Sequence, residues 1–378
     1  MVRLVNEARH IPAELWEKSF AHLCLDHRYY PLLEETLPQN FTYRYLLIED
    51  AGGRPRSVQP IFVVHQDLVA GLPPAVRRCV DFVRGLFPRL LKLNTLMIGC
   101  SAGEGELGAV SEMDRRWIAE ALHEALPNVA AKLCTDIIVL KDFPSRHRSA
   151  LSIFTANGYQ RVASLPAVHL PLDFADFEDY MTTRLSKKTR KNLRQKFRRS
   201  EDAGLEMEVV SDIGEIAGGL DQIYPLYEAV HGRSRFQFEK LTVSYFREIG
   251  KRMADRSRFF LWRKDGKIVA FSLCFIHDGE IYDCCMGLDY SVALDLHLYF
   301  VTWRDVVSWA IRNGVTRYYS GPLNYEPKYH FRCELSPLDL YVAHTNKWIN
   351  PFFRRLLAYL EPVRHQPIVR TFPNAHEL

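Results

Sequence analysis

A glutamate and a lysine two residues apart directly follow a predicted strand in the last quarter of the chain. They are Glu326 and Lys328, in the segment GPLNYEPK (321–328) after the β-rich run 316–320. An amine can anchor an anionic group and a carboxylate can accept a proton, so the pair suits proton transfer at a strand end. A surface turn that carries an ion pair has the same spacing, and both interpretations stay open at this point.

A second group of acid–base side chains surrounds the end of a predicted strand (280–288) and the start of a predicted long helix. The group contains Tyr282, Asp283, Asp289 and His297. An imidazole changes its charge near neutral pH, so His297 is a candidate general base, with Asp289 beside it. A single histidine at a helix start also commonly caps or packs the helix, and that alternative stays open.

Glycines mark a third candidate, the segment CSAGEG (100–105) between a predicted strand and a predicted helix. Gly103 and Gly105 would allow the backbone to approach a phosphate, and the N–H groups that open the next helix favour an anion. Glu104 and Glu106 would repel a pyrophosphate unless they point away. An ordinary strand-to-helix turn has the same pattern.

The run SKKTRKNLRQKFRRS (186–200) holds eight Lys or Arg and no acid, in a chain whose formal net charge is only +4. The rest of the chain therefore carries −4 (4 − 8). Leu193 and Phe197 lie four residues apart, which predicts a helix with one thin apolar stripe. Such a helix favours a phosphorylated cofactor, an anionic lipid surface, an acidic carrier protein or RNA. Lys187, Lys188 and Arg190 are the candidate cofactor contacts; a solvated linker helix is the alternative.

The 378 residues are too many for one ordinary core, so two domains are expected. The eight cysteines are scattered through apolar contexts, which fits reduced thiols in a cytoplasm rather than a disulfide framework. The N-terminus has no signal-peptide pattern, and no apolar run is long enough to span a membrane. His22, Cys24, Asp26 and His27 lack a second cluster, so no metal site is predicted.

The order of predicted elements is similar in the two halves. In the first half we predict strands at 43–49, 57–64, 95–98, 135–140, 161–163 and 167–170, and helices at 76–93, 112–126 and 146–157. In the second half we predict strands at 205–210, 258–263, 267–276, 280–288 and 316–320, and helices at 213–231, 239–254 and 298–313. The chain therefore reads as mixed α/β twice, with the basic helix at the seam.

The second-half order resembles a GNAT acyltransferase domain, and the first half resembles another through its CSAGEG loop and the ending FTANGYQRV. The segment between the two halves, LSKKTRKNLRQKFRR, is similar to the start of domains in the Fem-like branch of the GNAT superfamily. The stretch LDLHLYFVTWRDVVSWAIRNGVTRYYSGPLNYEPKYHFRCELSP is similar to that branch's C-terminal signature. The resemblance spans about residues 40 to 345.

The resemblance implies an α/β (α+β) fold of two tandem GNAT-like domains, each a mixed, largely antiparallel sheet flanked by helices. We expect an N-terminal domain at 1–180, a basic linker helix at 181–204 and a C-terminal domain with an amphipathic tail at 205–378. It also implies a polar site with His297, Glu326 and Lys328, and phosphate contacts at Gly103 and Gly105. The Gln or Arg that usually opens the GNAT phosphate loop is Cys100 here.

The activity that this resemblance implies is transfer of an acyl group to an amine. The cosubstrate would be acyl-CoA or the phosphopantetheine of an acyl carrier protein, with no permanently bound cofactor. The basic segments 76–93 and 347–357 suit an anionic membrane surface, although an apolar face packed on the core would explain either. They favour a lipid-like amine as acceptor, as in ceramide-type N-acylation, and a cytoplasmic protein at the inner membrane face.

Two other functions stay open. A Fem-type transferase would move an amino acid from aminoacyl-tRNA to a peptidoglycan precursor, with the basic helix facing RNA; otherwise no nucleic acid partner is expected. A tandem GNAT protein without catalysis would serve as a binding module.

Overall fold

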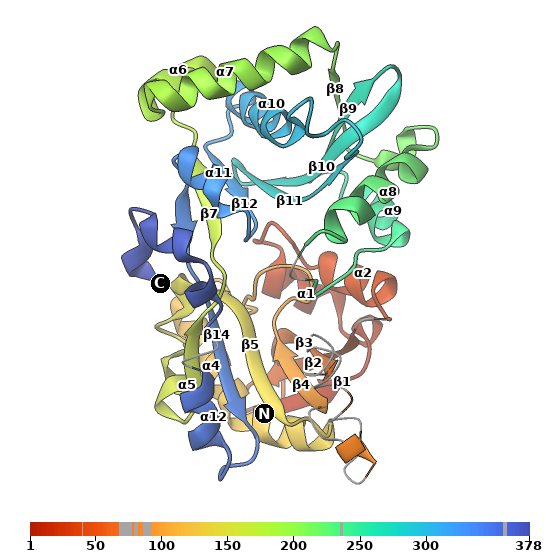
Figure 1. Ribbon diagram of the computed structural model, residues 1–378. Coiled ribbons are helices and arrows are strands. Elements are labelled where there is room, and N and C mark those ends of the chain that lie inside the picture. Colours follow the sequence, from red (N-terminus) through yellow and green to blue (C-terminus); the bar gives the residue numbers. More distant parts are fainter. Residues whose placement is uncertain (40, 68–77, 79–81, 86–91, 235–236, 358–360) are drawn as a thin grey trace. The chain divides into compact units, whose positions relative to one another are not determined.

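The computed structural model describes residues 1–378 except 40, 68–77, 79–81, 86–91, 235–236 and 358–360 (Figure 1). Most of the predicted amphipathic helix 76–93 lies outside the described residues. The chain forms two compact units, each built from separate segments. Unit 1 comprises Met1–His22, Tyr29–Ser164 and Leu338–His365, and unit 2 comprises Leu23–Arg28, Leu165–Pro337 and Gln366–Leu378.

Unit 1 is built on a seven-stranded sheet of order β1-β2-β3-β4-β5-β14-β6. Its strands are β1 (Val2–Val5), β2 (Thr42–Glu49), β3 (Pro55–Asp67), β4 (Lys92–Ile98), β5 (Ile137–Pro144), β6 (Gln160–Ala163) and β14 (Leu338–His344). Among these described strands, β4 and β5 form the one parallel pair, and every other neighbour is antiparallel. The parallel pair requires a crossover, which α4 (Glu112–Lys132) supplies.

Helices cover the sheet of unit 1. Helix α4 contributes Ile118, Leu122 and Leu126 to a core that includes strand residues such as Leu96 and Leu140. The helix begins at Ser111, whose side chain accepts a hydrogen bond from the Asp114 amide. The remaining helices of this unit are α1 (Ala13–Phe20), α2 (Tyr29–Thr36), α5 (Ser152–Ala156) and α12 (Asn350–Leu357).

Unit 2 repeats the arrangement with the order β13-β7-β12-β11-β10-β9-β8. Its strands are β7 (Ala167–Pro171), β8 (Glu206–Val210), β9 (Ser257–Lys264), β10 (Lys267–His277), β11 (Glu280–Leu288), β12 (Arg317–Ser320) and β13 (Glu334–Ser336). Here β11 and β12 are the parallel pair among the described strands, joined through α10 (Leu298–Arg312). Both units are thus mixed, largely antiparallel sheets flanked by helices, which confirms the predicted fold class.

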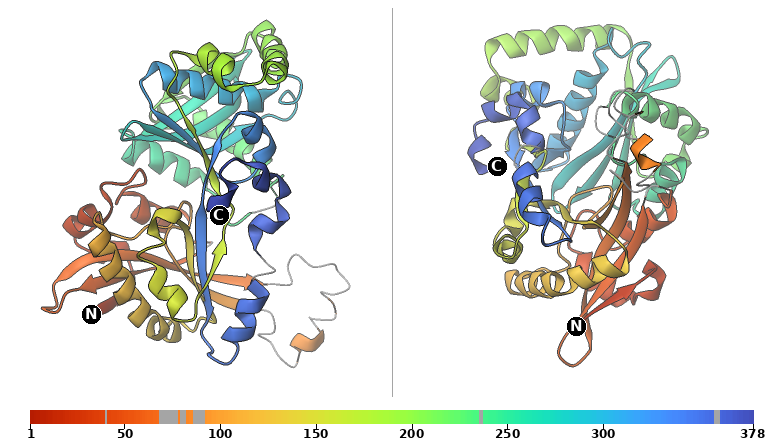
Figure 2. Two further views of the ribbon diagram at one scale, coloured as in Figure 1. Left: turned by 90° about the vertical axis from the view of Figure 1, so that its left-hand side faces the viewer. Right: turned by 60° about the horizontal axis from the view of Figure 1, so that its bottom comes forward.

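The other helices of unit 2 pack around this sheet. They are α6 (Phe177–Arg184), α7 (Lys187–Asp202), α8 (Gly219–His231), α9 (Val243–Arg252) and α11 (Tyr325–His330). The predicted basic helix is α7, which is capped by Ser186 and buries Leu193 and Phe197 as expected. It contacts α6 and α10, and Figure 2 shows it beside them. Helix α7 therefore belongs to unit 2.

Each sheet contains a strand from the other half of the sequence. Strand β14 lies between β5 and β6 in unit 1, and β7 lies between β12 and β13 in unit 2. The chain consequently crosses between units at 164/165 and 337/338, and again after residues 22, 28 and 365. The continuous segments 1–180, 181–204 and 205–378 do not coincide with these units, because the exchanged strands interrupt both.

Several elements differ from the sequence-based expectations. The single helix expected at 146–157 is a 3₁₀ turn (Ser145–His147) followed by the short α5. Hydroxyls explain the break, since Ser152 donates to the carbonyl of Ser149 and Thr155 to that of Ser152. Strands β1, β13 and β14 were not predicted.

Candidate active site

Strands β11 and β12 separate in the middle of the sheet of unit 2. Their parallel pairing runs from Glu280 with Arg317 to Asp283 with Ser320 and ends there. Strand β11 continues to Leu288, whereas β12 stops at Ser320. Among the described strands, none pairs with this edge of β11 beyond Asp283. We call this place the β11–β12 junction.

A β-bulge lies at the same point. Leu273 of β10 pairs with Cys285, but the next residue, Cys274, pairs with Asp283, so Cys284 is extra. Such a bulge bends the strand and changes the direction of nearby backbone groups. Cys284 is exposed at this position.

Asp283 is held by two hydroxyl groups. Its Oδ1 accepts a hydrogen bond from Ser272 Oγ at 2.5 Å, and its Oδ2 accepts one from Tyr318 OH at 2.7 Å. Burial raises the pKa of this carboxyl, and the hydrogen bonds and the Lys328 charge only partly offset the rise. The residue as a whole is half-buried, and its carboxyl is enclosed by the Ser272 and Tyr318 hydroxyls. Asp283 is therefore suited to accept a proton.

Lys328 lies on α11 and is only 7% exposed. Its Nζ donates to the carbonyl oxygens of Gly321 at 2.5 Å and Leu323 at 2.9 Å. Burial lowers its pKa to about 8, although Cys333 and Asp283 act to raise it. Leu323 and Asn324 have φ values of 73° and 50°, which non-glycine residues adopt at a cost. The lysine thus holds a strained segment directly after β12.

Tyr299 of α10 completes this group of side chains. It hydrogen-bonds Asn324, and burial, together with the nearby Cys333 and Asp283, raises its pKa well above the ordinary value. The hydroxyl therefore stays protonated and can donate. We call Ser272, Asp283, Tyr299, Tyr318 and Lys328 the junction cluster.

The other predicted catalytic residues lie apart from this cluster or face away from it. Glu326 is exposed, although it is only two residues from the buried Lys328. His297 precedes α10 with φ of 51°, and burial and then the charges of Lys196 and Arg199 lower its pKa. Asp289 accepts hydrogen bonds from the amide and hydroxyl of Ser291 and so forms a turn.

The cations nearest to the start of α10 were not predicted. They are Lys196 and Arg199, whose charges act on His297. Lys196 Nζ lies 3.2 Å from the centre of the Phe300 ring, and burial lowers its pKa. On α7, Lys196 directly precedes the buried Phe197 and Arg199 follows it by two residues. Their place next to this buried residue is the sequence signal that could have identified them.

The predicted cofactor contacts on α7 lie closer to its N-terminus. Lys187 and Lys188 are exposed, and nine residues of helix place Lys187 roughly 14 Å along the axis from Lys196. Arg190 donates to the carbonyls of Thr182 and Leu185 at the end of α6. That contact joins the two helices.

The predicted phosphate loop follows β4 in unit 1. The amide of Gly105 donates to Asp142 O at 2.9 Å, and Lys141 Nζ donates to Gly103 O at 3.1 Å. A Cβ on Gly105 would lie 2.3 Å from the Lys141 carbonyl oxygen. Glycine is therefore required for close packing of the loop on β5.

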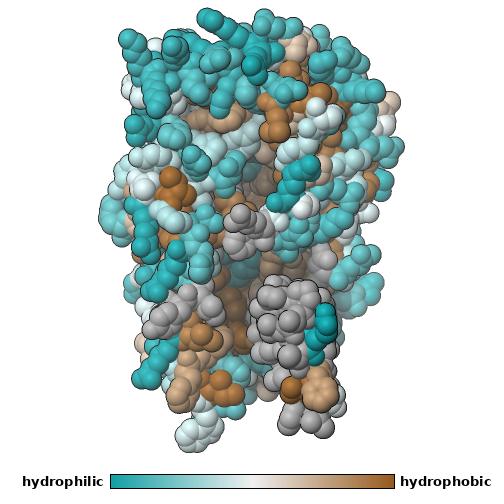
Figure 3. Space-filling view, in the orientation of Figure 1, coloured by the Kyte–Doolittle hydropathy of each residue, from teal (hydrophilic) through white to brown (hydrophobic). Residues whose placement is uncertain are grey.

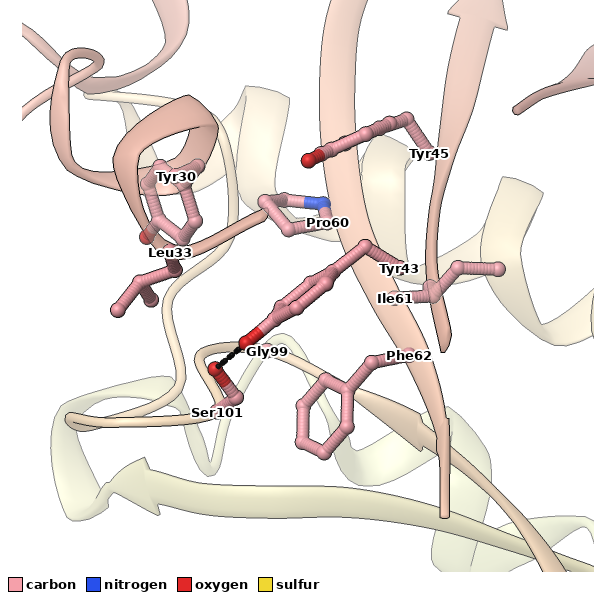
Figure 4. A pocket seen from close by; sticks show the side chains of 9 residues that line it. All are labelled: Tyr30, Leu33, Tyr43, Tyr45, Pro60, Ile61, Phe62, Gly99 and Ser101. Atoms are coloured by element: carbon pink, nitrogen blue, oxygen red, sulfur yellow. Dashed lines mark hydrogen bonds between the residues drawn. The ribbon is translucent and has the colours of Figure 1, made fainter. Parts of the chain in front are cut away.

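Aromatic hydroxyls hold the rest of this loop. Tyr29 OH donates to Ala102 O at 2.7 Å, and Tyr43 OH and Ser101 Oγ are 2.8 Å apart (Figure 4). The cavity beside them has a volume of about 10 Å³, enough for one water molecule and no more.

Sequence reasoning named Lys328 as a candidate and noted Asp283, but it did not name Ser272, Tyr299 or Tyr318. A serine and a cysteine alternate within the apolar β10 (Phe271-Ser272-Leu273-Cys274), and this polar residue in a buried strand was the available signal.

Comparisons with known proteins concern the fold of the chain. Residues 187–329 match the acetyltransferase (GNAT) domain family. No curated protein matches the sequence. Three solved structures share the fold over most of the chain. A tandem GNAT protein from the clavulanic acid biosynthesis pathway has 13% identity, a TM-score of 0.50, and coverage of 92% of this chain and 99% of its own. FemX has 12% identity, a TM-score of 0.50, and coverage of 80% of this chain and 88% of its own. L-PGS from Bacillus licheniformis has 13% identity, a TM-score of 0.50, and coverage of 87% of this chain and 94% of its own.

The fold is therefore a tandem GNAT fold of the Fem-like kind, as predicted. The matched segment contains the β11–β12 junction and all five residues of the junction cluster. Among the described helices, we find none with the length and apolar character needed to cross a bilayer.

Proposed function

We propose that this protein transfers an acyl group from an acyl thioester to an amine at the β11–β12 junction of unit 2. One observation carries the proposal: the parallel strands separate at Asp283, a carboxyl whose pKa is raised by burial, beside the buried Lys328. A thioester can enter where the strands part, and a proton acceptor lies at the same place.

In this mechanism the amine nitrogen attacks the thioester carbonyl, the C–N bond forms and the C–S bond breaks. Asp283 takes the proton that the nitrogen loses, and the Tyr299 hydroxyl donates a hydrogen bond to the leaving thiolate. The thiolate then takes a proton from solvent, and Asp283 returns its proton to solvent. Backbone N–H groups of β11 beyond Asp283 would polarise the carbonyl, and one such donor typically contributes ~3 kcal/mol.

Lys328 acts as a positioning residue. Its hydrogen bonds to Gly321 and Leu323 hold the segment that follows β12. This segment forms the far side of the junction, and a shift of 1 Å there can lower a rate about a hundredfold.

The anionic part of the donor is proposed to lie near the start of α10. Lys196 and Arg199 gather there with the positive end of the helix dipole. This placement replaces Gly103 and Gly105 as the proposed phosphate contacts, because the Gly105 amide already donates to Asp142.

The acceptor is proposed to be a lipid-like amine, and the donor acyl-CoA or an acyl carrier protein. Fem-type transfer from aminoacyl-tRNA remains the second candidate, which the structural likeness to FemX keeps open.

The test measures product by mass spectrometry with three donors: acyl-CoA, acyl carrier protein and aminoacyl-tRNA. Each is offered to short-chain amines, long-chain amines and a peptidoglycan precursor. We expect turnover with a thioester and an amine, lost in Asp283→Asn and kept in the exposed control Glu326→Gln. Turnover with aminoacyl-tRNA alone would refute the thioester proposal. If none of the three donors supports turnover, the protein would instead be a binding module without catalysis.

A further inference from the structure

Exposed apolar side chains form a stripe on α12 of unit 1 and on the turn before it. The α12 stripe consists of Trp348, Ile349, Phe352 and Leu356, with Trp348 77% and Phe352 72% exposed. These are four of the ten large apolar residues that are exposed in the described part of the chain, within nine positions. Hydrophobic side chains are visible at the place of α12 in Figure 3. Such a concentration usually marks a binding surface.

The opposite face of α12 is fixed to the body of unit 1. Asn350 Oδ1 accepts a hydrogen bond from the His344 amide at 2.9 Å, and its Nδ2 donates to Gly158 O at 2.8 Å. The Phe353 ring lies 5.8 Å from the His344 ring, edge to face. The stripe is therefore presented outward by a helix held in place, and its exposure follows from this packing.

The charged residues within the segment that carries the stripe are all basic. Between Asn346 and Leu357 the sequence contains Lys347, Arg354 and Arg355 and no acidic residue. Lys347 and Arg355 are exposed beside the stripe. Tryptophan, phenylalanine and leucine on one face, with arginine and lysine next to them, are typical of a helix that lies in the plane of a membrane surface.

We propose that α12 is a contact site for an anionic lipid surface, with the α12 stripe inserted at the boundary between headgroups and acyl chains. Lys347 and Arg355 would pair with lipid phosphates. This site is independent of the proposed acyltransferase function.

Other occupants fit less well. Two copies meeting stripe to stripe would bring their arginines together, which costs free energy. An apolar groove on a partner protein would also receive such a helix, but α12 offers only basic groups and about two turns. A lipid surface accepts a projecting helix without a matching shape and supplies the anions. The helix is short, so binding should be reversible and should need both charge and apolar contact.

The experiment is sedimentation of the full-length protein with phosphatidylcholine vesicles, with and without phosphatidylglycerol. We expect binding to the anionic vesicles only. Trp348→Ser with Phe352→Ser should lower the partition coefficient at least about tenfold. Lys347→Gln with Arg355→Gln should lower it about fivefold per charge. The control is Val110→Ser with Met113→Ser, two apolar residues exposed elsewhere on unit 1, and should leave it unchanged.

Fluorescence supplies a second readout. Brominated lipids should quench the emission of the wild-type protein, and Trp348→Phe should abolish most of that quenching. Equal binding by wild-type protein and the Trp348/Phe352 variant, or no binding to either vesicle, would overturn the proposal. So would a dimer in sedimentation velocity that the same variant dissociates, since the stripe would then join two copies.

Discussion

The two units carry the same sheet, yet their parallel strand pairs end differently. In unit 1, β4 stops at Ile98 and the loop after it continues along β5, with the Gly105 amide bonded to Asp142 O. In unit 2, β11 continues past β12 by five residues to Leu288 (288 − 283), and a bulge at Cys284 bends it. The equivalent strand pair of unit 1, β3 with β4, has no such bulge, because its register is unbroken from Ile61 to Asp67. One junction is filled by its own loop, and at the other β11 continues past the end of its partner strand β12.

The polar residues differ in the same way. In unit 1 the hydroxyls of Tyr29 and Tyr43 are used to hold the loop. In unit 2 the hydroxyls of Ser272 and Tyr318 hold the carboxyl of Asp283, at the point where β11 and β12 separate. The comparison teaches that the fold alone does not make a site: under the proposed function unit 2 would carry the chemistry, whereas unit 1 shares its architecture.

The largest expected effect comes from exchanging one carboxylate in each unit. Asp283→Asn should lower kcat about 10²–10⁴-fold, because the amide cannot accept the proton from the amine. Glu104→Gln removes a carboxyl of unit 1 whose pKa is also raised, chiefly by burial, and should leave kcat within a factor of two or so. Initial rates of thiol release measure both. Equal losses in the two variants would break the distinction between the units.

A second effect concerns the stability of unit 2 as a function of pH. Lys328 has a pKa of about 8 in the folded protein against an ordinary value of 10.5, so the unfolded chain binds more protons between these values. The free energy of unfolding should therefore rise from pH 8 to 10.5, by up to about 3 kcal/mol relative to Lys328→Met.

Urea unfolding at several pH values measures this difference. Lys187→Met serves as the control, because Lys187 is an exposed lysine of the same unit. A difference between wild-type protein and Lys328→Met that stays constant over this range would contradict the burial of an ionisable lysine at the junction.

A smaller effect tests the closed loop of unit 1. Gly105→Ala would place a Cβ against the Lys141 carbonyl and the Phe143 ring, so the free energy of unfolding should fall by about 1–3 kcal/mol. KM for the donor should not change in the folded variant. Gly52→Ala, in an exposed hairpin turn, is the control. Normal stability with a raised KM would show instead that this loop contacts phosphate.

The fold was largely predictable because its strands are short β-rich runs with clear turns. The meander β9–β11 is an example, since Asp265-Gly266 and Asp278-Gly279 adopt the positive φ values that such turns need. The exchange of β7 and β14 was not predictable, because pairing between strands distant in sequence leaves no local pattern.

The site was predictable only in part. Lys328 lies in a recognisable motif, but spacing alone suggested Glu326 as its partner, and on α11 those two positions point in different directions. The hydroxyls of Ser272, Tyr299 and Tyr318 come from three separate elements. Only the folded chain brings them to Asp283.

The central claim is that the acyl donor binds at the β11–β12 junction, and two native cysteines can test it. Cys284 is exposed at the bulge of unit 2, and Cys134 is exposed in unit 1. Alkylation by iodoacetamide is followed at each residue by mass spectrometry, with and without the acyl donor that supports turnover. With donor at ten times its Kd, labelling of Cys284 should slow about tenfold while labelling of Cys134 stays unchanged. Unchanged labelling of Cys284 at that concentration would contradict the account.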